Sequence, residues 1–258
     1  MKQFGCLLFF HLFFCLFCGT LVASEIKSDS HINIKTAGQF KMGMAYLNGN
    51  GVNQDYKLAF KWLLETAKDG HPEAQFNVGW MYDTGKGVLR NHVLAFQWYS
   101  KAAKQGITPA EFNLGRCYHN GNGTAKDYVK AASWYKLAAQ KGHAMAQNNL
   151  GLLYHAGKGL EVNYLKAIKW YNQAAKQGLA DAQNNLAVMF AFGKGVQLDY
   201  IQAYAWLIVA KSKGVNNHNL STLIDSKLTP KEMVESQKLA SRIISEQDSQ
   251  FSNQLTSP

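Results

Sequence analysis

Cysteine is scarce in this chain, and its placement leaves no internal disulfide to expect. Three of the four cysteines, Cys6, Cys15 and Cys18, lie in an apolar N-terminal run that we predict to be removed, so only Cys117 remains. A mature fold held together by internal disulfide bonds is therefore excluded. A homodimer linked through Cys117 remains an alternative, although the register of this residue in the repeat described below favours a buried, inert thiol.

Strand signals and short catalytic motifs are also missing. No alternating run of β-branched residues occurs, which argues against a β-sheet protein. The predicted mature chain has no Gly-x-Ser-x-Gly, no phosphate-binding loop, no His-Glu-x-x-His and no Cys-x-x-Cys. We therefore expect no catalytic residues, no cofactor and no metal.

Acidic residues are outnumbered by basic ones. The chain has 27 Lys and Arg against 17 Asp and Glu, a formal net charge of +10, and the predicted leader removes only Lys2 from this excess. A basic surface favours anionic partners without choosing among them. Because the lysines are dispersed over helix ends and export is expected, we predict no nucleic-acid partner. Contact with an anionic membrane or glycan is a weaker alternative.

The first 24 residues have the form of a signal peptide. Lys2 supplies a positive charge, the run from Phe4 to Cys18 is almost unbroken apolar sequence, and small residues precede a cleavage point after Ala23 or Ser24. The run is shorter than the roughly 20 residues that a membrane-spanning helix needs. We predict a secreted or periplasmic protein with a lead-in over residues 25–37; a retained membrane anchor is the alternative.

Comparison of the chain with itself reveals a repeat of 36 residues. A Gly-x-Gly pair recurs at this interval, formed by Gly49 and Gly51, Gly85 and Gly87, Gly121 and Gly123, Gly157 and Gly159, and Gly193 and Gly195. A tryptophan keeps the same interval at Trp62, Trp98, Trp134, Trp170 and Trp206. Copies without insertion or deletion indicate a stack of identical structural modules.

Each module has the signals of two helices. In the second copy, Ala74, Val78 and Met81 have helical spacing, and Gly85 ends the helix because glycine readily adopts the left-handed conformation. An Asp or Asn that can cap the second helix recurs at Asp55, Asn91, Asp127, Asn163 and Asp199. Glycine also recurs in mid-helix at Gly43, Gly79, Gly115 and Gly151, which predicts a close helix crossing. We expect the tryptophans to fill the core between repeats.

These signals predict an all-α fold, an α/α superhelical solenoid of five 36-residue helix-turn-helix repeats with a C-terminal capping helix. The repeats are expected at 38–73, 74–109, 110–145, 146–181 and 182–217. A polar connector and the capping helix follow over 218–246, and a flexible tail over 247–258. Thr229 and Glu232 have the spacing of a capping box, as do Thr108 and Glu111.

The pattern resembles the Sel-one-like repeat family, a relative of the tetratricopeptide repeats. The family's motif stands here at Ala146 to Gly151, Tyr154, Gly157 to Gly159, Ala167, Trp170-Tyr171 and Ala174-Ala175. The resemblance covers residues 38–217 and implies a protein-interaction scaffold. Secreted bacterial members are often implicated in envelope signalling or host-cell contact. Cysteine-rich relatives that look like β-lactam-binding proteins depend on a disulfide in each repeat, which this chain lacks.

Two positions of the first helix vary between repeats while their neighbours do not. The position of Trp80 holds Arg116, Leu152 and Val188, and the position of Asp83 holds His119, His155 and Ala191. In related solenoids this helix lines the concave face, and Trp and Arg are enriched at interface hot spots. We therefore predict a binding groove for an unknown protein or peptide, to which these residues contribute: Trp80, Asp83, Arg116, His119 and His155. Ordinary solvated surface is the alternative, and a metal shared by the two histidines lacks a third ligand.

The sequence thus favours an exported protein–protein interaction scaffold that holds a partner on its concave face, in envelope signalling or host-cell contact. The alternative is an envelope hydrolase acting on peptidoglycan or a β-lactam. That activity would need a nucleophile or paired carboxylates, and the repeats supply neither in register.

Overall fold

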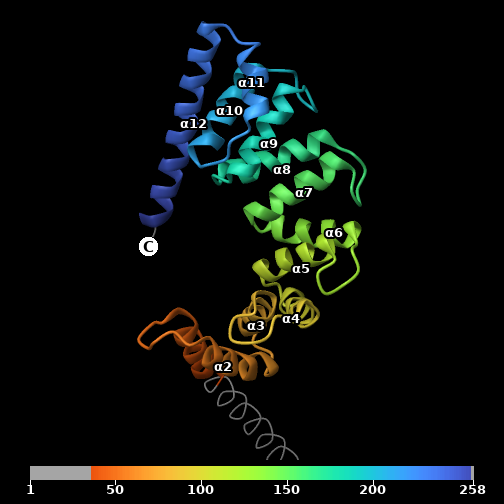
Figure 1. Ribbon diagram of the computed structural model, residues 1–258, viewed down its shortest axis with the longest axis vertical. Coiled ribbons are helices and arrows are strands. Elements are labelled where there is room, and N and C mark those ends of the chain that lie inside the picture. The colour runs from red at the N-terminus through yellow and green to blue at the C-terminus, as the bar shows by residue number, and fades with distance from the viewer. Residues whose placement is uncertain (1–35, 257–258) are drawn as a thin grey trace, which may run out of the picture. The chain divides into compact units, whose positions relative to one another are not determined.

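The computed structural model describes residues 36–256, with side chains to residue 249, and this part of the chain is helical without a strand (Figure 1). The all-α fold class is therefore confirmed. The predicted signal peptide, most of the lead-in and residues 257–258 lie outside the described residues. The chain divides into two compact units: unit 1 ends at Asn91, and unit 2 begins at His92.

The helices alternate as the repeat predicts. Unit 1 contains a helix over residues 36–48 followed by α2 (Tyr56–Lys68) and α3 (Pro72–Thr84). Unit 2 contains α4 (His92–Lys104), α5 (Thr108–Asn120), α6 (Tyr128–Gln140), α7 (Ala144–Ala156), α8 (Tyr164–Lys176), α9 (Ala180–Ala191), α10 (Tyr200–Ser212), α11 (His218–Asp225) and α12 (Pro230–Thr256). The first helices of repeats two to five thus begin two residues before the boundaries expected from the sequence.

The predicted helix ends carry the expected caps. The side chains of Asp55, Asp127, Asn163 and Asp199 each accept a hydrogen bond from an amide of the following first turn. Gly85, Gly121 and Gly157 end α3, α5 and α7 in the left-handed conformation, with φ of 77°, 81° and 67°. Local chemistry therefore sets the start of these second helices and the end of these first helices.

The second glycine of a Gly-x-Gly pair has a different role, which is to let consecutive repeats meet. A Cβ on Gly87 would collide with the backbone carbonyl of Tyr56, at the start of the preceding repeat's second helix. Gly123 meets His92 in the same way, and Gly159 meets Tyr128. This contact fixes how the loop of one repeat rests on the helix before it.

The first and last Gly-x-Gly pairs depart in part from this pattern. Gly51 has a left-handed φ of 74°, but no described residue lies within 4 Å of a Cβ built on it, so it shapes its own turn and makes no repeat contact. Gly195 keeps the contact, since its Cβ would lie 2.6 Å from the Cβ of Tyr164. Its pair-mate Gly193 is not the cap of α9, because that cap is Phe192. All the glycines of the Gly-x-Gly pairs therefore have the left-handed backbone conformation. Not all of them cap a helix or make the contact between repeats.

The mid-helix glycines confirm a close helix crossing, but the residue that fills the core is not the tryptophan. A Cβ on Gly115 would lie 2.6 Å from the ring of Tyr135, and one on Gly151 would lie 2.7 Å from the ring of Tyr171. Tyr135 is 1% exposed and Tyr171 is fully buried.

The expectation that the tryptophans fill the core between repeats is therefore wrong for four of the five. Trp206 is buried at 9% exposure, whereas these four are only partly buried: Trp62, Trp98, Trp134 and Trp170. The residue after each of the four points into the core instead, because neighbours on a helix are turned about 100° from each other.

One of the two predicted capping boxes forms. The Thr229 amide donates to Glu232 Oε2 at 2.8 Å, and the Glu232 amide donates in return to Thr229 Oγ1 at 3.3 Å. At the other site Thr108 lies inside α5, whose N-cap Ile107 makes no side-chain hydrogen bond. Glu111 is drawn away from this cap, since its buried carboxylate pairs with Lys141 Nζ at 2.7 Å.

The C-terminal part is more helical than the sequence predicted. The polar connector contains α11, which forms because Leu220 and Ile224 are buried against the last repeat. Helix α12 packs along α10 (Figure 1) and places Met233, Leu239 and Ile243 on the core of that repeat. It continues to Thr256, so residues 247–256 are helical rather than a flexible tail. Gln247 anchors this stretch by donating to the Ala175 carbonyl at 2.9 Å.

Candidate functional site

The five predicted binding residues are partly exposed and lie on first helices of the repeats. Trp80 and Asp83 belong to α3 in unit 1, Arg116 and His119 to α5, and His155 to α7 in unit 2. The residues on either side of Trp80 and Arg116 are buried, whereas those on either side of Asp83, His119 and His155 are not. Packing therefore leaves these five side chains partly accessible.

Trp80 lines a groove of about 430 Å³ within unit 1. Its walls come from the helix over residues 36–48, the start of α2, and α3. We call it the Trp80 groove, and its lining residues are Met44, Leu47, Asn48, Gln54, Tyr56, Phe76, Asn77, Trp80 and Lys86. Asp83, on the same helix, does not line it. The groove has an apolar floor with a few polar groups at its rim, which is the usual composition of a recognition site.

Lys86 gives this groove its charge. Its Nζ lies 4.8 Å from the centroid of the Trp80 ring and 4.9 Å from that of Tyr56. The two aromatic faces hold the ammonium by cation–π attraction. A partner that inserts an apolar side chain beside Trp80 thus meets a positive charge at the same place.

His119 lies in a similar cluster in unit 2. Its ring meets that of Tyr128 edge-on at 5.2 Å, and its Nδ1 is buried without a hydrogen-bond partner among the described residues. Burial lowers the pKa of His119, and the charges of Lys158 and Lys126 lower it further. The ring is therefore held neutral beside two lysines.

His155 repeats this arrangement one module later. Its ring meets Tyr164 at 5.5 Å, and Lys194 Nζ lies 3.2 Å from its Nε2. Because an ammonium can only donate, Nε2 acts as the acceptor and the imidazole is neutral. Burial and the charge of Lys194 lower the pKa of His155.

Arg116 lies beside the buried core rather than in a cleft of its own. Burial raises the pKa of Tyr135 to about 12, while a hydrogen bond to Asn149 and the charge of Arg116 oppose the rise. Arg116 is thus a cation close to the Tyr135 hydroxyl, at the repeat position that Trp80 occupies in unit 1.

Loop lysines and helix-start tyrosines, which were not predicted from the sequence, complete these clusters. Lys86, Lys158 and Lys194 each stand inside a Gly-x-Gly pair and lie over a tyrosine of the repeat before, namely Tyr56, Tyr128 and Tyr164. The sequence does mark the tyrosines as a repeated position, because each directly follows a capping Asp or Asn. Only the contact between consecutive repeats brings the two residues together.

Other predicted features are placed as follows. Cys117 is free and 5% exposed, so a disulfide to a second chain would require it to leave the core. Within residues 36–256, no three His, Cys, Asp or Glu side chains gather as a metal site would need, and no helix is long and apolar enough to cross a membrane.

Comparisons with known proteins agree with the repeat geometry. The family model described as Sel1 repeat matches residues 36–71, 72–107, 108–143, 144–179 and 180–215. A Sel1 repeat protein from Oxalobacter formigenes has a crystal structure with a TM-score of 0.68 and 31% identity, over 80% of this chain and 87% of that one.

Two more distant structures are similar as well. A putative sel1 repeat protein from Klebsiella pneumoniae subsp. pneumoniae is 20% identical over 81% of this chain and 92% of that one, with a TM-score of 0.46. Helicobacter pylori cysteine rich protein B is 27% identical over 52% of this chain and 97% of that one, with a TM-score of 0.40. No curated protein matches the chain.

Proposed function

Because this chain belongs to the Sel1 repeat family, whose members generally bind protein partners, we propose that it is an exported scaffold that holds a peptide segment of another protein. The Trp80 groove carries this proposal. It offers an accessible indole, a second aromatic ring and an apolar floor in one cavity of about 430 Å³. Buried aromatic anchors in such pockets supply most of the binding energy at protein interfaces.

The chemistry of the groove specifies the segment it would take. An apolar side chain fits beside Trp80 and Phe76, and a neighbouring carboxylate meets Lys86. The side-chain amide of Asn48 can bond an extended peptide backbone. The amide nitrogens of Gln54 and Asn77 already donate to backbone carbonyls, so these two residues offer mainly their amide oxygens. The partner is therefore a segment with an apolar anchor next to an acidic residue.

The test is to pan a random peptide display library against the full chain and to measure the selected peptides by fluorescence anisotropy. Trp80→Ala should weaken binding about thirtyfold, since a central aromatic anchor contributes about 2 kcal/mol. Lys86→Gln should weaken only the peptides that carry an acidic residue. Arg116→Glu tests whether the equivalent position in unit 2 contributes.

Leu89→Ala is the matched control, because Leu89 is 90% exposed in the same unit and lies outside the groove. It should leave affinity unchanged. Selected peptides that bind Trp80→Ala as tightly as the unchanged chain would rule the groove out.

Export is the second part of the proposal and depends on residues 1–24, outside the described part of the chain. Expression of the full gene with its leader, followed by mass spectrometry of the protein's N-terminus, should give a chain that begins at Ser24 or Glu25. Recovery of the full-length chain in the membrane fraction would instead indicate a retained anchor.

A further inference from the structure

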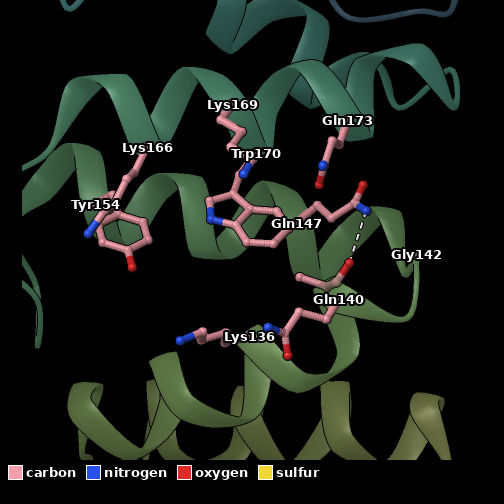
Figure 2. A pocket seen from close by; sticks show the side chains of 10 residues that line it. Lys136, Gln140, Gly142, Gln147, Tyr154, Lys166, Lys169, Trp170 and Gln173 are labelled. Atoms are coloured by element: carbon pink, nitrogen blue, oxygen red, sulfur yellow. Dashed lines mark hydrogen bonds between the residues drawn. The ribbon is translucent and has the colours of Figure 1, made fainter.

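A second cavity, of about 540 Å³, lies in unit 2 and is built from the second helices of two repeats (Figure 2). Helices α6 and α8 form its sides, and α7 with the turn before it forms its floor. We call it the lysine pocket, and its lining residues are Lys136, Ala139, Gln140, Gly142, Gln147, Tyr154, Lys166, Lys169, Trp170 and Gln173.

The charge of this pocket is of one sign. Three lysines line it, Lys136, Lys166 and Lys169, and no acidic residue does. Lys166 Nζ lies 5.3 Å from the centroid of the Tyr154 ring, which orients it. Lys136 and Lys169 are exposed and have no ion-pair partner within the described part of the chain. Three unneutralised ammonium groups around one cavity attract an anion.

The repeat fold does not require these lysines. At the junction one repeat earlier, the positions of Lys136, Lys166 and Lys169 hold Ser100, Lys130 and Ser133. At the junction one repeat later they hold Asn172, Gln202 and Ala205. The three-lysine set therefore occurs at this junction alone among these three, on a backbone that all of them share.

Trp170 and two amides complete the pocket. The indole is partly buried against the core and presents its remaining surface in the middle of the cavity, with Gln173 to one side and Lys136 and Tyr154 to the other (Figure 2). Gln147 already donates to the Ala139 carbonyl at 3.1 Å. The side-chain amides of Gln140 and Gln173, in contrast, bond no other described residue. They are free to pair with a ligand.

We infer that the lysine pocket binds an acidic oligosaccharide, a sugar chain that bears carboxylate or sulfate groups. The apolar face of a sugar ring can lie on the Trp170 indole. Its hydroxyls match the free amides of Gln140 and Gln173, which can both donate and accept. Its anionic groups meet Lys136 and Lys169. An acidic peptide or an inorganic phosphate would use the charges but not the indole.

This inference is independent of the Trp80 groove, which lies in unit 1 and shares no residue with the lysine pocket. The test is isothermal titration of the full chain with three tetrasaccharides: heparin-derived, hyaluronan-derived and the neutral cellotetraose. One or both acidic sugars should bind saturably, and cellotetraose should bind at least tenfold more weakly. The two acidic probes distinguish sulfate from carboxylate recognition.

A double variant, Lys136→Gln with Lys169→Gln, should weaken the acidic sugar at least tenfold, because two charged contacts are lost. Its matched control is Lys231→Gln with Lys238→Gln, which removes the same charge from exposed positions of α12. The control should bind normally. The inference is overturned if neither acidic sugar binds, if the control weakens equally, or if a penta-aspartate peptide or a single-stranded tetranucleotide binds as tightly as the sugar.

Discussion

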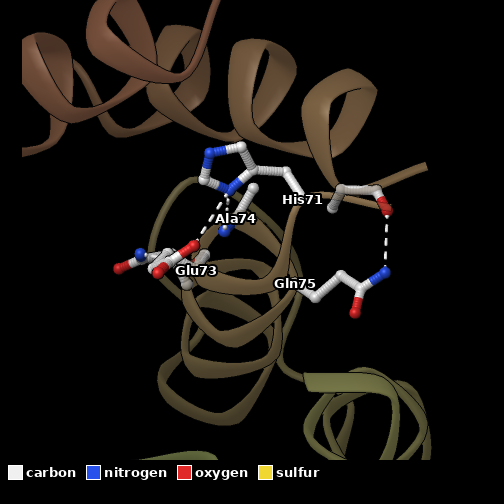
Figure 3. Close-up of polar contacts among 6 residues, drawn as sticks. His71, Glu73, Ala74 and Gln75 are labelled. Carbon is white, nitrogen blue, oxygen red and sulfur yellow. Dashed lines mark hydrogen bonds and ion pairs between the residues drawn. The ribbon is translucent and has the colours of Figure 1, made fainter. Parts of the chain in front are cut away.

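At the scale of single residues, two helices begin at a histidine whose ring nitrogen faces an amide of the first turn. His71 Nδ1 lies 3.4 Å from the Ala74 amide nitrogen and 3.3 Å from Glu73 Oε2 (Figure 3). The His71 ring also stacks on Phe40. In unit 2 the Ala146 amide donates to His143 Nδ1 at 3.3 Å, and the His143 ring stacks on Phe112 at 4.5 Å. A protonated His143 ring has no lone pair to accept this bond.

We predict from this that unit 2 loses stability in mild acid. Burial lowers the pKa of His143 below the ordinary value of 6.5, and burial also lowers the pKa values of His119 and His155. The stabilisation is complete above about pH 6.5 and is lost as the pH falls below it, because the unfolded chain then takes up protons more readily. Thermal unfolding followed by circular dichroism should show a lower Tm at pH 5 than at pH 7.5.

His143→Asn isolates one contribution to this difference. Asparagine still caps a helix but does not titrate, so the Tm difference between the two pH values should shrink by about 2–4 °C, equivalent to about 1 kcal/mol. His218→Asn, at an exposed position, should leave the Tm difference between the two pH values unchanged. An unaltered pH dependence in His143→Asn would show that its neutral ring is not what acid disrupts.

At the scale of the element, each repeat depends on one residue pair where its two helices cross. Gly115 faces Tyr135, and Gly151 faces Tyr171. The last repeat uses a different pair, Ala187 and Leu207, both buried. In the last repeat, where alanine replaces the glycine, leucine thus stands in the place of the tyrosine, and the first repeat has Gly43 facing Leu63. Close packing limits the combined size of each pair.

We therefore predict that Gly151→Ala destabilises the protein although alanine is the better helix former. The new methyl group would lie 2.7 Å from the Tyr171 ring. Relieving this overlap should cost about 1–3 kcal/mol, more than the roughly 0.5–1 kcal/mol that alanine contributes in a helix. Urea unfolding measures the difference.

Adding Tyr171→Leu reproduces the pair found in the last repeat and should recover part of the loss. Gly106→Ala is not a suitable control, since Gly106 has a φ of 85°. Gly38→Ala is a suitable control, because nothing lies within 4 Å of its added methyl group. A double variant no more stable than Gly151→Ala would contradict the pairing.

The sequence predicted these elements well because their determinants are local. Capping residues, left-handed glycines and apolar spacing act within a few positions, and all recur every 36 residues. The sequence did not show whether Trp170 or Tyr171 is the residue that fills the core. The two are adjacent and both aromatic, and their stripe of buried alanines is compatible with either.

The candidate sites were harder to predict for a related reason. Trp80 was identified because its repeat position varies, but Tyr56 and Lys86 became its neighbours only through the contact of one loop with the preceding helix. Lys136 and Lys169 come from two different repeats, and no spacing in the sequence marks their common cavity. Asp83 also stands at a repeat position that varies, as Trp80 does, and yet it lies outside the groove.

At the scale of the whole molecule, the repeats need an end, because each module buries its apolar face against the next. Helix α12 supplies that end in unit 2. It covers the core of the last repeat with Met233, Leu239 and Ile243, and the buried residues Trp206 and Leu207 belong to the same cluster. Gln247 adds polar anchors, since its Oε1 accepts from Lys213 Nζ at 2.8 Å.

Ending the chain at Thr229 should therefore expose the last repeat's core. Several partly buried aliphatic side chains lose their cover, so unit 2 should lose on the order of 5 kcal/mol and bind a hydrophobic dye. Leu239→Asp is the companion change, which keeps the helix and so guards against a truncated chain too unstable to purify; it should lower the urea midpoint strongly. Val234→Asp places the same charge on the exposed side of α12, where Val234 is 48% exposed, and should change little. Equal effects of the two aspartates would mean that α12 stabilises unit 2 by helicity alone, without covering its core.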